Sequence, residues 1–273
     1  MLSDRLKAAL TATPFGAVAL AWQARRALTG LNYANPEQAS AVANAIIAGK
    51  LITRLPVFRG LFVDVGAHVG SIFGTLLRHQ PGSQVHAFEA DPTKALTLQH
   101  SYPKVKVTAA AVGPEAGRVA LFVGSGATGY NSIVANENEE RARIEVPMVA
   151  LDEALDGDVA SIKIDVEGAE FGVLKGAKTV LARSRPVVMF ESVGLGLNAL
   201  GYSAEGIWNL LHELEYEIFT PNRVAHEGCG MSAETFRDSH VYPFRSLDYF
   251  AVAKERITEV RTQARRVLGI ATV

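Results

Sequence analysis

Two acidic residues stand at the ends of two segments with the apolar character of buried strands. Asp64 lies in the run L-F-V-D-V and is followed by Gly66 and Gly70, whereas Glu89 ends the run Q-V-H-A-F-E. In a parallel α/β sheet, ligands bind at the carboxyl ends of the strands. Glycines at such a turn let a ligand approach the backbone closely. The two segments therefore predict a site for a nucleotide-like ligand.

The spacing of the glycines favours one class of ligand. Three residues separate Gly66 from Gly70, and Asp64 stands where the dinucleotide fingerprint has its first glycine, so no G-x-G-x-x-G can be written. A carboxylate here would repel a pyrophosphate and suit an ammonium group. S-adenosylmethionine carries an ammonium and a sulfonium but no phosphate, so we expect Asp64 towards its methionine end and Glu89 towards its ribose. The expected cofactor-binding residues are Asp64, Gly66, Ala67, His68, Gly70, Glu89, Asp91 and Ala111.

Three more acids could take part in chemistry at the same edge of the sheet. Asp165 ends the run S-I-K-I-D, Glu167 lies in the turn that follows, and Glu191 ends the run V-V-M-F-E. Transfer of a methyl group to a protonated acceptor requires a base within about 3 Å of the acceptor's proton. Asp165, Glu167 and Glu191 are therefore the candidate catalytic residues, and the sequence does not rank them.

The blocks V-D-V-G-A-H-V-G, F-E-A-D-P and K-I-D-V-E-G-A-E, in this order, resemble the FkbM family of S-adenosylmethionine-dependent methyltransferases. The resemblance covers roughly residues 60–254. His68 replaces an Asn that is frequent in the family and Ala90 a frequent Pro, but neither change removes a group that the ligand needs. The resemblance implies a class I, Rossmann-like methyltransferase fold. It also implies O-methylation of a small-molecule or glycan acceptor, such as a sugar, a glycolipid or a secondary metabolite.

Other functions were weighed against this one. Three converging acids could hold Mg²⁺, which takes oxygen ligands, but the resemblance implies no metal and we expect none. A catalytically inactive methyltransferase-like binding protein stays open. A nicotinamide-dependent dehydrogenase stays open as well, although the glycine spacing disfavours it. The sequence has neither a G-x-S-x-G elbow nor a P-loop, which argues against hydrolysis by those routes.

The elements that must position these residues alternate along the chain. We expect an α/β fold with a doubly wound, mostly parallel seven-stranded sheet, a helical N-terminal extension and an inserted β-hairpin. The long polar connection 124–141 within the hairpin could cover the acceptor. Strands are expected near 61–65, 84–88, 105–111, 118–123, 143–149, 160–165, 186–191, 216–220 and 247–253. Helices are expected near 1–30, 36–51, 70–79, 92–100, 169–182 and 203–214.

Length and composition bound the remaining expectations. The 273 residues divide into an extension (1–58), a methyltransferase domain (59–256) and a C-terminal helical tail (257–273). The net charge of −1 argues against nucleic-acid binding. Cys229 is the single cysteine, which fits a reducing compartment. The uncharged stretch between Lys7 and Arg25 is too rich in alanine for a membrane span. We expect a cytoplasmic protein, and leave open both attachment to a membrane surface and pairing of two copies through the N-terminal helices.

Overall fold

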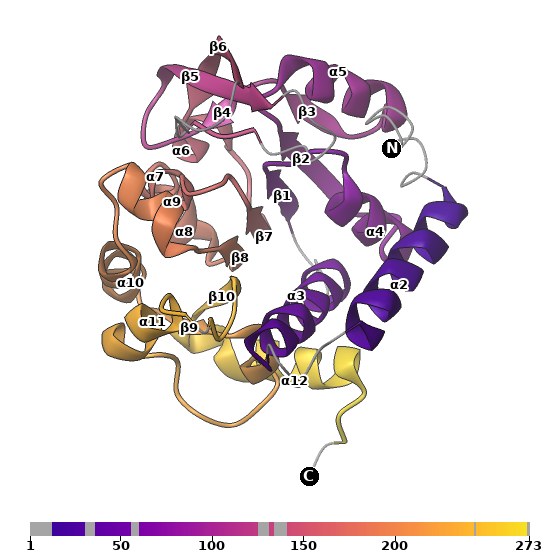
Figure 1. Cartoon of the computed structure of the whole chain (residues 1–273), viewed down its shortest axis with the longest axis vertical. Coiled ribbons are helices and arrows are strands. Elements are labelled where there is room, and N and C mark those ends of the chain that lie inside the picture. The colour runs from indigo at the N-terminus through magenta and orange to yellow at the C-terminus, as the bar shows by residue number, and fades with distance from the viewer. Residues whose placement is uncertain are drawn as a thin grey trace.

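A seven-stranded sheet forms the centre of the structure, a computed structural model that describes residues 13–30, 36–55, 60–124, 131–133, 141–242 and 244–271 (Figure 1). Its strand order is β3-β2-β1-β7-β8-β10-β9. Neighbouring strands are parallel except β10, which is antiparallel to both β8 and β9. The predicted doubly wound sheet is confirmed. Its strands are β1 Leu61–Val65, β2 Gln84–Phe88, β3 Lys106–Thr108, β7 Val159–Ile164, β8 Val187–Glu191, β9 Tyr216–Phe219 and β10 Asp248–Ala253.

Helices cover both faces of this sheet because each face buries its own apolar cluster. One cluster takes Val173, Leu181 and Leu211 from α7, α8 and α10. The other takes Phe73 and Leu98 from α4 and α5. The helices are α2 Pro14–Thr29, α3 Pro36–Arg54, α4 Ser71–His79, α5 Pro92–Ser101, α6 Leu151–Ala154, α7 Glu170–Lys175, α8 Lys178–Ser184, α9 Gly194–Ala199, α10 Ala204–Glu213, α11 Ala233–Ser239 and α12 Ile257–Leu268, with short 3-10 turns η1 Pro221–Arg223 and η2 Lys254–Arg256.

A small second sheet contains the predicted hairpin. Strands β4 Ala111–Val112, β5 Gly117–Gly124 and β6 Arg141–Val149 lie in the order β4-β6-β5, with β5 and β6 antiparallel. The single strand predicted at 105–111 is wrong. The chain bends where the Ala110 N–H donates to the Thr108 carbonyl, and it thereby leaves the large sheet at β3 and enters the small one at β4. Most of the connection 124–141 lies outside the described residues, apart from 131–133.

One long helix predicted at 169–182 is in fact two, α7 and α8. The chain turns at Gly176, whose carbonyl accepts from the Asp152 N–H. A Cβ at Gly176 would collide with the carbonyl oxygen of Gly113, so the backbones approach too closely for another residue. The short helices α6, α9 and α11 were not predicted because none is long enough to show a helical period.

The terminal helices differ in how they join the core. Leu51 and Ile52 from α3 pack in the same cluster as Val260 and Ala264 from α12. In α2, by contrast, Val18 and Trp22 are exposed. Among the helices of the described residues, none combines the length and the apolar character that crossing a membrane requires.

Candidate active site

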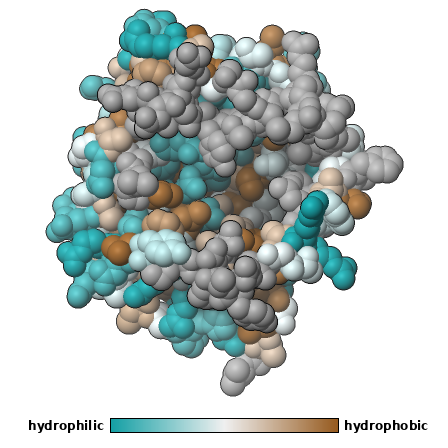
Figure 2. Space-filling view, in the orientation of Figure 1, coloured by the Kyte–Doolittle hydropathy of each residue, from teal (hydrophilic) through white to brown (hydrophobic). Residues whose placement is uncertain are grey.

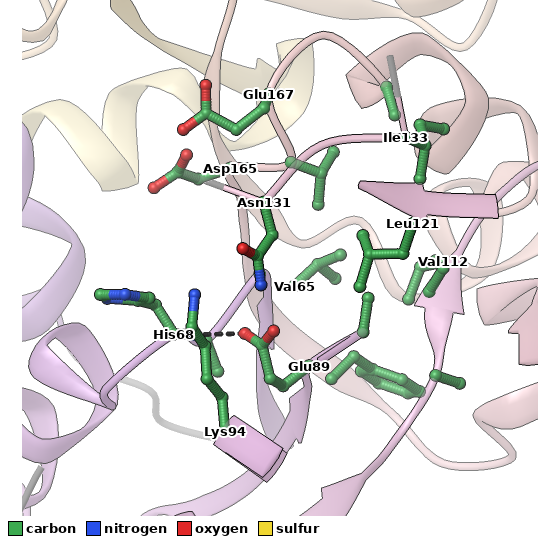
Figure 3. A pocket seen from close by; sticks show the side chains of 18 of the residues that line it. Val65, His68, Glu89, Lys94, Val112, Leu121, Asn131, Ile133, Asp165 and Glu167 are labelled. Carbon is green, nitrogen blue, oxygen red and sulfur yellow. Dashed lines mark hydrogen bonds between the residues drawn. The ribbon is translucent and has the colours of Figure 1, made fainter. Parts of the chain in front are cut away.

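A cavity of about 350 Å³ opens at the carboxyl ends of β1, β2 and β7 (Figure 3). Five of the eight predicted cofactor-binding residues line it, namely Gly66, Ala67, His68, Glu89 and Ala111. The space-filling view shows apolar side chains gathered in the middle of the same face as Figure 1, with hydrophilic ones predominating along its left margin (Figure 2). The other residues that line the cavity are Val65, Ser71, Ile72, Phe88, Ala90, Lys94, Ala110, Val112, Leu121, Asn131, Ile133, Lys163, Asp165, Val166, Glu167 and Ala169.

Glu89 follows β2, and its carboxylate is fixed by the backbone. Its Oε2 accepts from the His68 N–H at 2.7 Å (Figure 3). Its Oε1 accepts from the Asp91 N–H at 2.9 Å. Burial raises the pKa of this carboxyl, and these hydrogen bonds and the Lys94 ammonium oppose the rise. Each carboxylate oxygen still has a lone pair that can accept from a ligand hydroxyl.

The turn after β1 has left-handed backbone at three positions, Gly66, His68 and Gly70. The Gly66 and Ala67 N–H groups both donate to the Phe88 carbonyl, which ties the turn to β2. A Cβ at Gly66 would collide with the Asp165 carbonyl, and one at Gly70 would press on the ring of Phe73. Gly70 does not line the cavity. Both glycines are therefore required by contacts within the protein, in addition to any closeness to a ligand.

Asp64 lies below the cavity and does not line it. Its side chain is 1% exposed, and its Oδ1 lies 3.2 Å from the Nζ of Lys163. The Lys163 ammonium also donates to the Gly66 carbonyl at 2.7 Å and lies 3.4 Å from Asp165 Oδ2. Burial alone would lower the pKa of Lys163, but the two carboxylates outweigh it and raise the pKa. Lys163 therefore joins β1, the glycine turn and Asp165.

Asp91 does not line the cavity either; it caps the N-terminus of α5. Its Oδ1 accepts from the Thr93 N–H at 2.8 Å, and its Oδ2 accepts from the Asn131 amide at 2.9 Å. Asn131 does line the cavity, together with Ile133. Asp91 thus fastens the described part of the connection 124–141 over the cavity.

The three candidate catalytic acids come together. Within the described residues, one carboxylate oxygen from each of Asp165, Glu167 and Glu191 lies within 4.8 Å of the others, close enough to hold a metal ion. Asp165 and Glu167 line the cavity, and their carboxylates point to the side opposite Val112 and Leu121 (Figure 3). We call Asp165, Glu167 and Glu191 the acid cluster.

Burial and mutual repulsion control protonation in the acid cluster. Burial, followed by the charges of Asp165 and Glu167, raises the pKa of Glu191 to about 9. Asp248 pairs in register with Glu191 across β10 and β8, and burial together with Asp165 raises its pKa to about 6. The raised pKa of Glu191 therefore favours its protonated carboxyl at neutral pH.

Glu170 supports the turn that carries Glu167. Its Oε1 accepts from the Val166 N–H at 3.2 Å and from the Gly168 N–H at 3.1 Å. Burial raises the pKa of Glu170 to about 7. The turn has left-handed backbone at Glu167 itself. Glu167 therefore lies at the cavity, and Glu170 lies beneath it and holds the turn.

Sequence reasoning missed Lys163, Asn131 and Asp248. Lys163 had a recognisable signature, because a lysine in the apolar run A-S-I-K-I must be buried in a strand and so needs an acidic partner. Asp64 on the neighbouring strand is that partner. No local pattern marks Asn131 or Asp248, since their neighbours at the site come from distant parts of the chain.

Known proteins were compared with this chain. The sequence matches the family described as the methyltransferase FkbM domain over residues 64–218, more than half of the chain. No curated protein matches it.

Solved methyltransferases align with this chain at low identity. The methyltransferase FkbM from Methylobacillus flagellatus is 16% identical, with a TM-score of 0.46, over 86% of this chain and 58% of that one. This chain thus spans less than two thirds of that structure. A methyltransferase of Thermobifida fusca described as putative is 14% identical, with a TM-score of 0.42, over 91% of this chain and 92% of that one. The plantazolicin methyltransferase BpumL, in complex with a desmethyl analogue and S-adenosylhomocysteine, is 8% identical, with a TM-score of 0.42, over 91% and 95%.

The family match identifies a methyltransferase domain in this chain. It covers Asp64, Glu89, Asp165 and Glu191, and so includes both the cavity and the acid cluster. A nicotinamide-dependent dehydrogenase is accordingly set aside. The methyl donor is S-adenosylmethionine, and the chain belongs to the FkbM methyltransferase family.

Proposed function

We propose that this chain transfers a methyl group from S-adenosylmethionine to a hydroxyl oxygen of a sugar, glycan, glycolipid or secondary metabolite. The observation that carries the proposal is the acid cluster beside the cavity, where three carboxyl oxygens lie within 4.8 Å of one another. O-methylation needs an acceptor for the hydroxyl proton, and a carboxylate at this place supplies one.

The described residues fit the cofactor. Glu89 is held by two backbone N–H groups and could accept hydrogen bonds from the ribose hydroxyls. Ala111 and the apolar residues Phe88, Val112 and Leu121 line a part of the cavity that suits the adenine ring. When bound, S-adenosylmethionine supplies an electrophilic methyl group on a sulfonium.

Three predicted cofactor-binding residues have an indirect role in this proposal. Asp64 holds Lys163, which holds the carbonyl of Gly66. Gly70 permits the close packing of Phe73 at the start of α4. Asp91 holds Asn131 at the cavity. The direct contacts would come from Gly66, Ala67, His68, Glu89 and Ala111, which line the cavity.

Asp165 is our first choice for the base. It lines the cavity, and its side chain is 48% exposed, so an acceptor hydroxyl can reach it. The raised pKa of Glu191 favours its protonated form at neutral pH. In that form Glu191 would donate a hydrogen bond to the acceptor and would not take up the acceptor's proton. As the acceptor oxygen gains the methyl group, its proton passes to Asp165. Catalysis otherwise rests on holding donor and acceptor aligned.

A divalent cation is the one rival that a specific observation favours, because the acid cluster has the ligands that Mg²⁺ takes. A cation there would acidify the hydroxyl directly and would keep Glu191 ionised. We propose the metal-free route, and EDTA should then leave turnover unchanged. Loss of turnover in EDTA with recovery in Mg²⁺ would establish the cation route.

The test of the function uses a panel of hydroxyl compounds and S-adenosylmethionine labelled in its methyl group. The panel comprises sugars, glycans, glycolipids and secondary metabolites. We expect label in at least one product, and the carbon chemical shift of that product should be that of a methoxy group. Label on nitrogen or carbon would contradict O-methylation. Binding of S-adenosylhomocysteine without transfer to any compound would favour the inactive binding protein.

The cellular setting completes the proposal. We propose a cytoplasmic enzyme, because the methyl donor is made in the cytoplasm and Cys229 is free. The exposed Trp22 and Val18 of α2 are the surface on which two copies would pair. Analytical ultracentrifugation of the full chain and of Trp22→Ala would test that pairing.

A further inference from the structure

A second cavity, of about 510 Å³, lies where β9 ends and contains two arginines. Its lining includes Arg223 from η1 and Arg245 from the loop before β10. No carboxylate is among its described lining residues. The Glu217 carboxylate accepts from the N–H of Gly230, one of the lining residues, at 2.7 Å. We call this space the arginine cavity.

Both arginines line the cavity as exposed residues. Arg223 and Arg245 are exposed, and neither guanidinium has a hydrogen bond or an ion pair within the described part of the chain. A guanidinium offers a planar fork of N–H donors that fits carboxylate or phosphate oxygens. Ser40, Thr220 and Thr235 add hydroxyl groups to the lining. The chemistry of this cavity suits an oxyanion on a hydrophilic molecule.

Asn44 fixes both arginine-bearing segments from below. It is 2% exposed, its Nδ2 donates to the Arg245 carbonyl at 3.0 Å, and its Oδ1 accepts from the Asn222 N–H at 3.0 Å. Ser40 Oγ donates to the same Arg245 carbonyl at 2.8 Å. One buried amide thus holds the backbone at Arg245 and at Asn222, the residue before Arg223.

The arginine cavity lies at the same edge of the sheet as the acid cluster. Asp165 follows β7, and Glu191 ends β8. Asp248 begins the antiparallel β10, and Thr220 follows β9. Since these strands are neighbours in the order β7-β8-β10-β9, three strand spacings, roughly 14 Å, separate the ends of β7 and β9. Along this edge the charge changes from acidic at β7 and β8 to basic at β9.

The geometry points to an anionic acceptor that spans this edge. We propose that the arginine cavity binds a phosphate or carboxylate group of the acceptor while the hydroxyl to be methylated lies at the acid cluster. The acids would repel the anion and the arginines would attract it, so only one orientation is favourable. This inference rests on the proposed function, and it narrows the acceptor class to anionic hydroxyl compounds.

A binding experiment tests the cavity without turnover. Inorganic phosphate is titrated into the full chain, and binding is followed by the NMR chemical shifts of the protein. We expect saturable binding that is weakened about 10-fold or more in Arg223→Gln and in Arg245→Gln. Arg266→Gln, which changes an exposed arginine of α12 outside the cavity, should bind as the original chain does. Asn44→Ala should weaken binding although both arginines remain. Equal binding by the original chain and the double variant Arg223→Gln/Arg245→Gln would overturn the proposal.

An activity experiment separates this proposal from the proposed function. Glucose, glucose 6-phosphate, glucuronic acid and vesicles that contain phosphatidylglycerol are offered with the labelled methyl donor. We expect methyl transfer to at least one of the anionic compounds. In the double variant Arg223→Gln/Arg245→Gln, the KM for that compound should rise about 10-fold or more while kcat changes little. Transfer to the vesicles alone would identify the anion as a lipid headgroup. If neutral glucose is methylated equally well by both proteins, the arginine cavity is not an acceptor site and O-methylation stands. Normal phosphate binding without binding of S-adenosylhomocysteine would instead contradict the proposed function.

Discussion

The carboxylate of Glu89 accepts a backbone hydrogen bond on each oxygen, so its position is fixed before a ligand binds. Removal of this group should weaken S-adenosylhomocysteine binding about 10- to 150-fold, because a hydrogen bond to a charged group contributes roughly 1.5–3 kcal/mol. Isothermal titration calorimetry of Glu89→Ala gives this value directly. Glu115→Ala, at an exposed turn, is the matched control. Unchanged affinity in Glu89→Ala would remove Glu89 from the ribose site.

Burial raises the pKa of Asp64, and the Lys163 ammonium beside it opposes that rise. Lys163→Met should lower the free energy of unfolding by about 3–5 kcal/mol, because an unpaired carboxylate is left buried. The double variant Asp64→Asn/Lys163→Met should recover part of that loss. Urea denaturation measures both, with the exposed Lys178→Met as control. Equal stabilities of Lys163→Met and the double variant would contradict the cost of an unpaired buried carboxylate at Asp64.

At the scale of elements, the ends of β8 and β10 make stability depend on pH. The pKa of Glu191 is about 9 in the folded chain and near the ordinary glutamate value of 4.5 in the unfolded chain, so between these values the folded state holds a proton that the unfolded state has lost. Stability should therefore fall as pH rises through this window, by up to about 1.4 kcal/mol per unit. Raised pKa values at Asp248 and Glu170 act in the same direction.

Thermal melts at several pH values between 5 and 9 test this dependence. Glu191→Gln should flatten the fall of Tm with rising pH, because the amide cannot ionise. Glu213→Gln, on the exposed side of α10, should retain the original slope. A slope that is the same in Glu191→Gln and in the original chain would contradict the raised pKa. Addition of Mg²⁺ that removes the slope in the original chain would favour a cation at the acid cluster.

Local sequence patterns predict most elements, because the spacing of apolar residues within a segment is enough to indicate a strand or a helix. The run L-F-V-D-V predicts β1, and Pro92 after the capping Asp91 predicts α5, within a residue of the observed bounds. The break between β3 and β4 was not predictable, because it depends on which sheet each strand joins. The turn at Gly176 was not predictable either, because it depends on the close approach of the Gly113 backbone.

At the scale of the molecule, the sequence indicates which edge of the sheet binds ligands but not which atoms face the cavity. Asp64 and Glu89 look equivalent in sequence, each an acid at the end of an apolar run. In the structure Glu89 lines the cavity, whereas Asp64 lies beneath it against Lys163. The difference arises from the alternation of side chains along the strand, combined with where the strand ends. Contacts between distant segments, such as Asn131 with Asp91, cannot be read from a single sequence.

The α2 helix should be dispensable for cofactor binding. None of its described residues lines either cavity, and Val18, Trp22 and Leu28 are exposed on it. A chain that lacks residues 1–30 should bind S-adenosylhomocysteine within about threefold of the full chain, because distant sites contribute independently. Calorimetry measures the affinity, and circular dichroism confirms folding. Loss of binding in a folded, truncated chain would contradict this expectation.

The rate of methyl transfer by Asp165→Asn tests the account most directly. The comparison is a single-turnover measurement with labelled S-adenosylmethionine at saturation and an acceptor found in the panel. A general base contributes about 10²–10⁴-fold, so Asp165→Asn should slow transfer by that factor while its affinity for S-adenosylhomocysteine stays nearly unchanged. Glu167→Gln and Glu191→Gln should have smaller effects. Transfer at the original rate by all three amide variants would contradict a carboxylate base at the acid cluster.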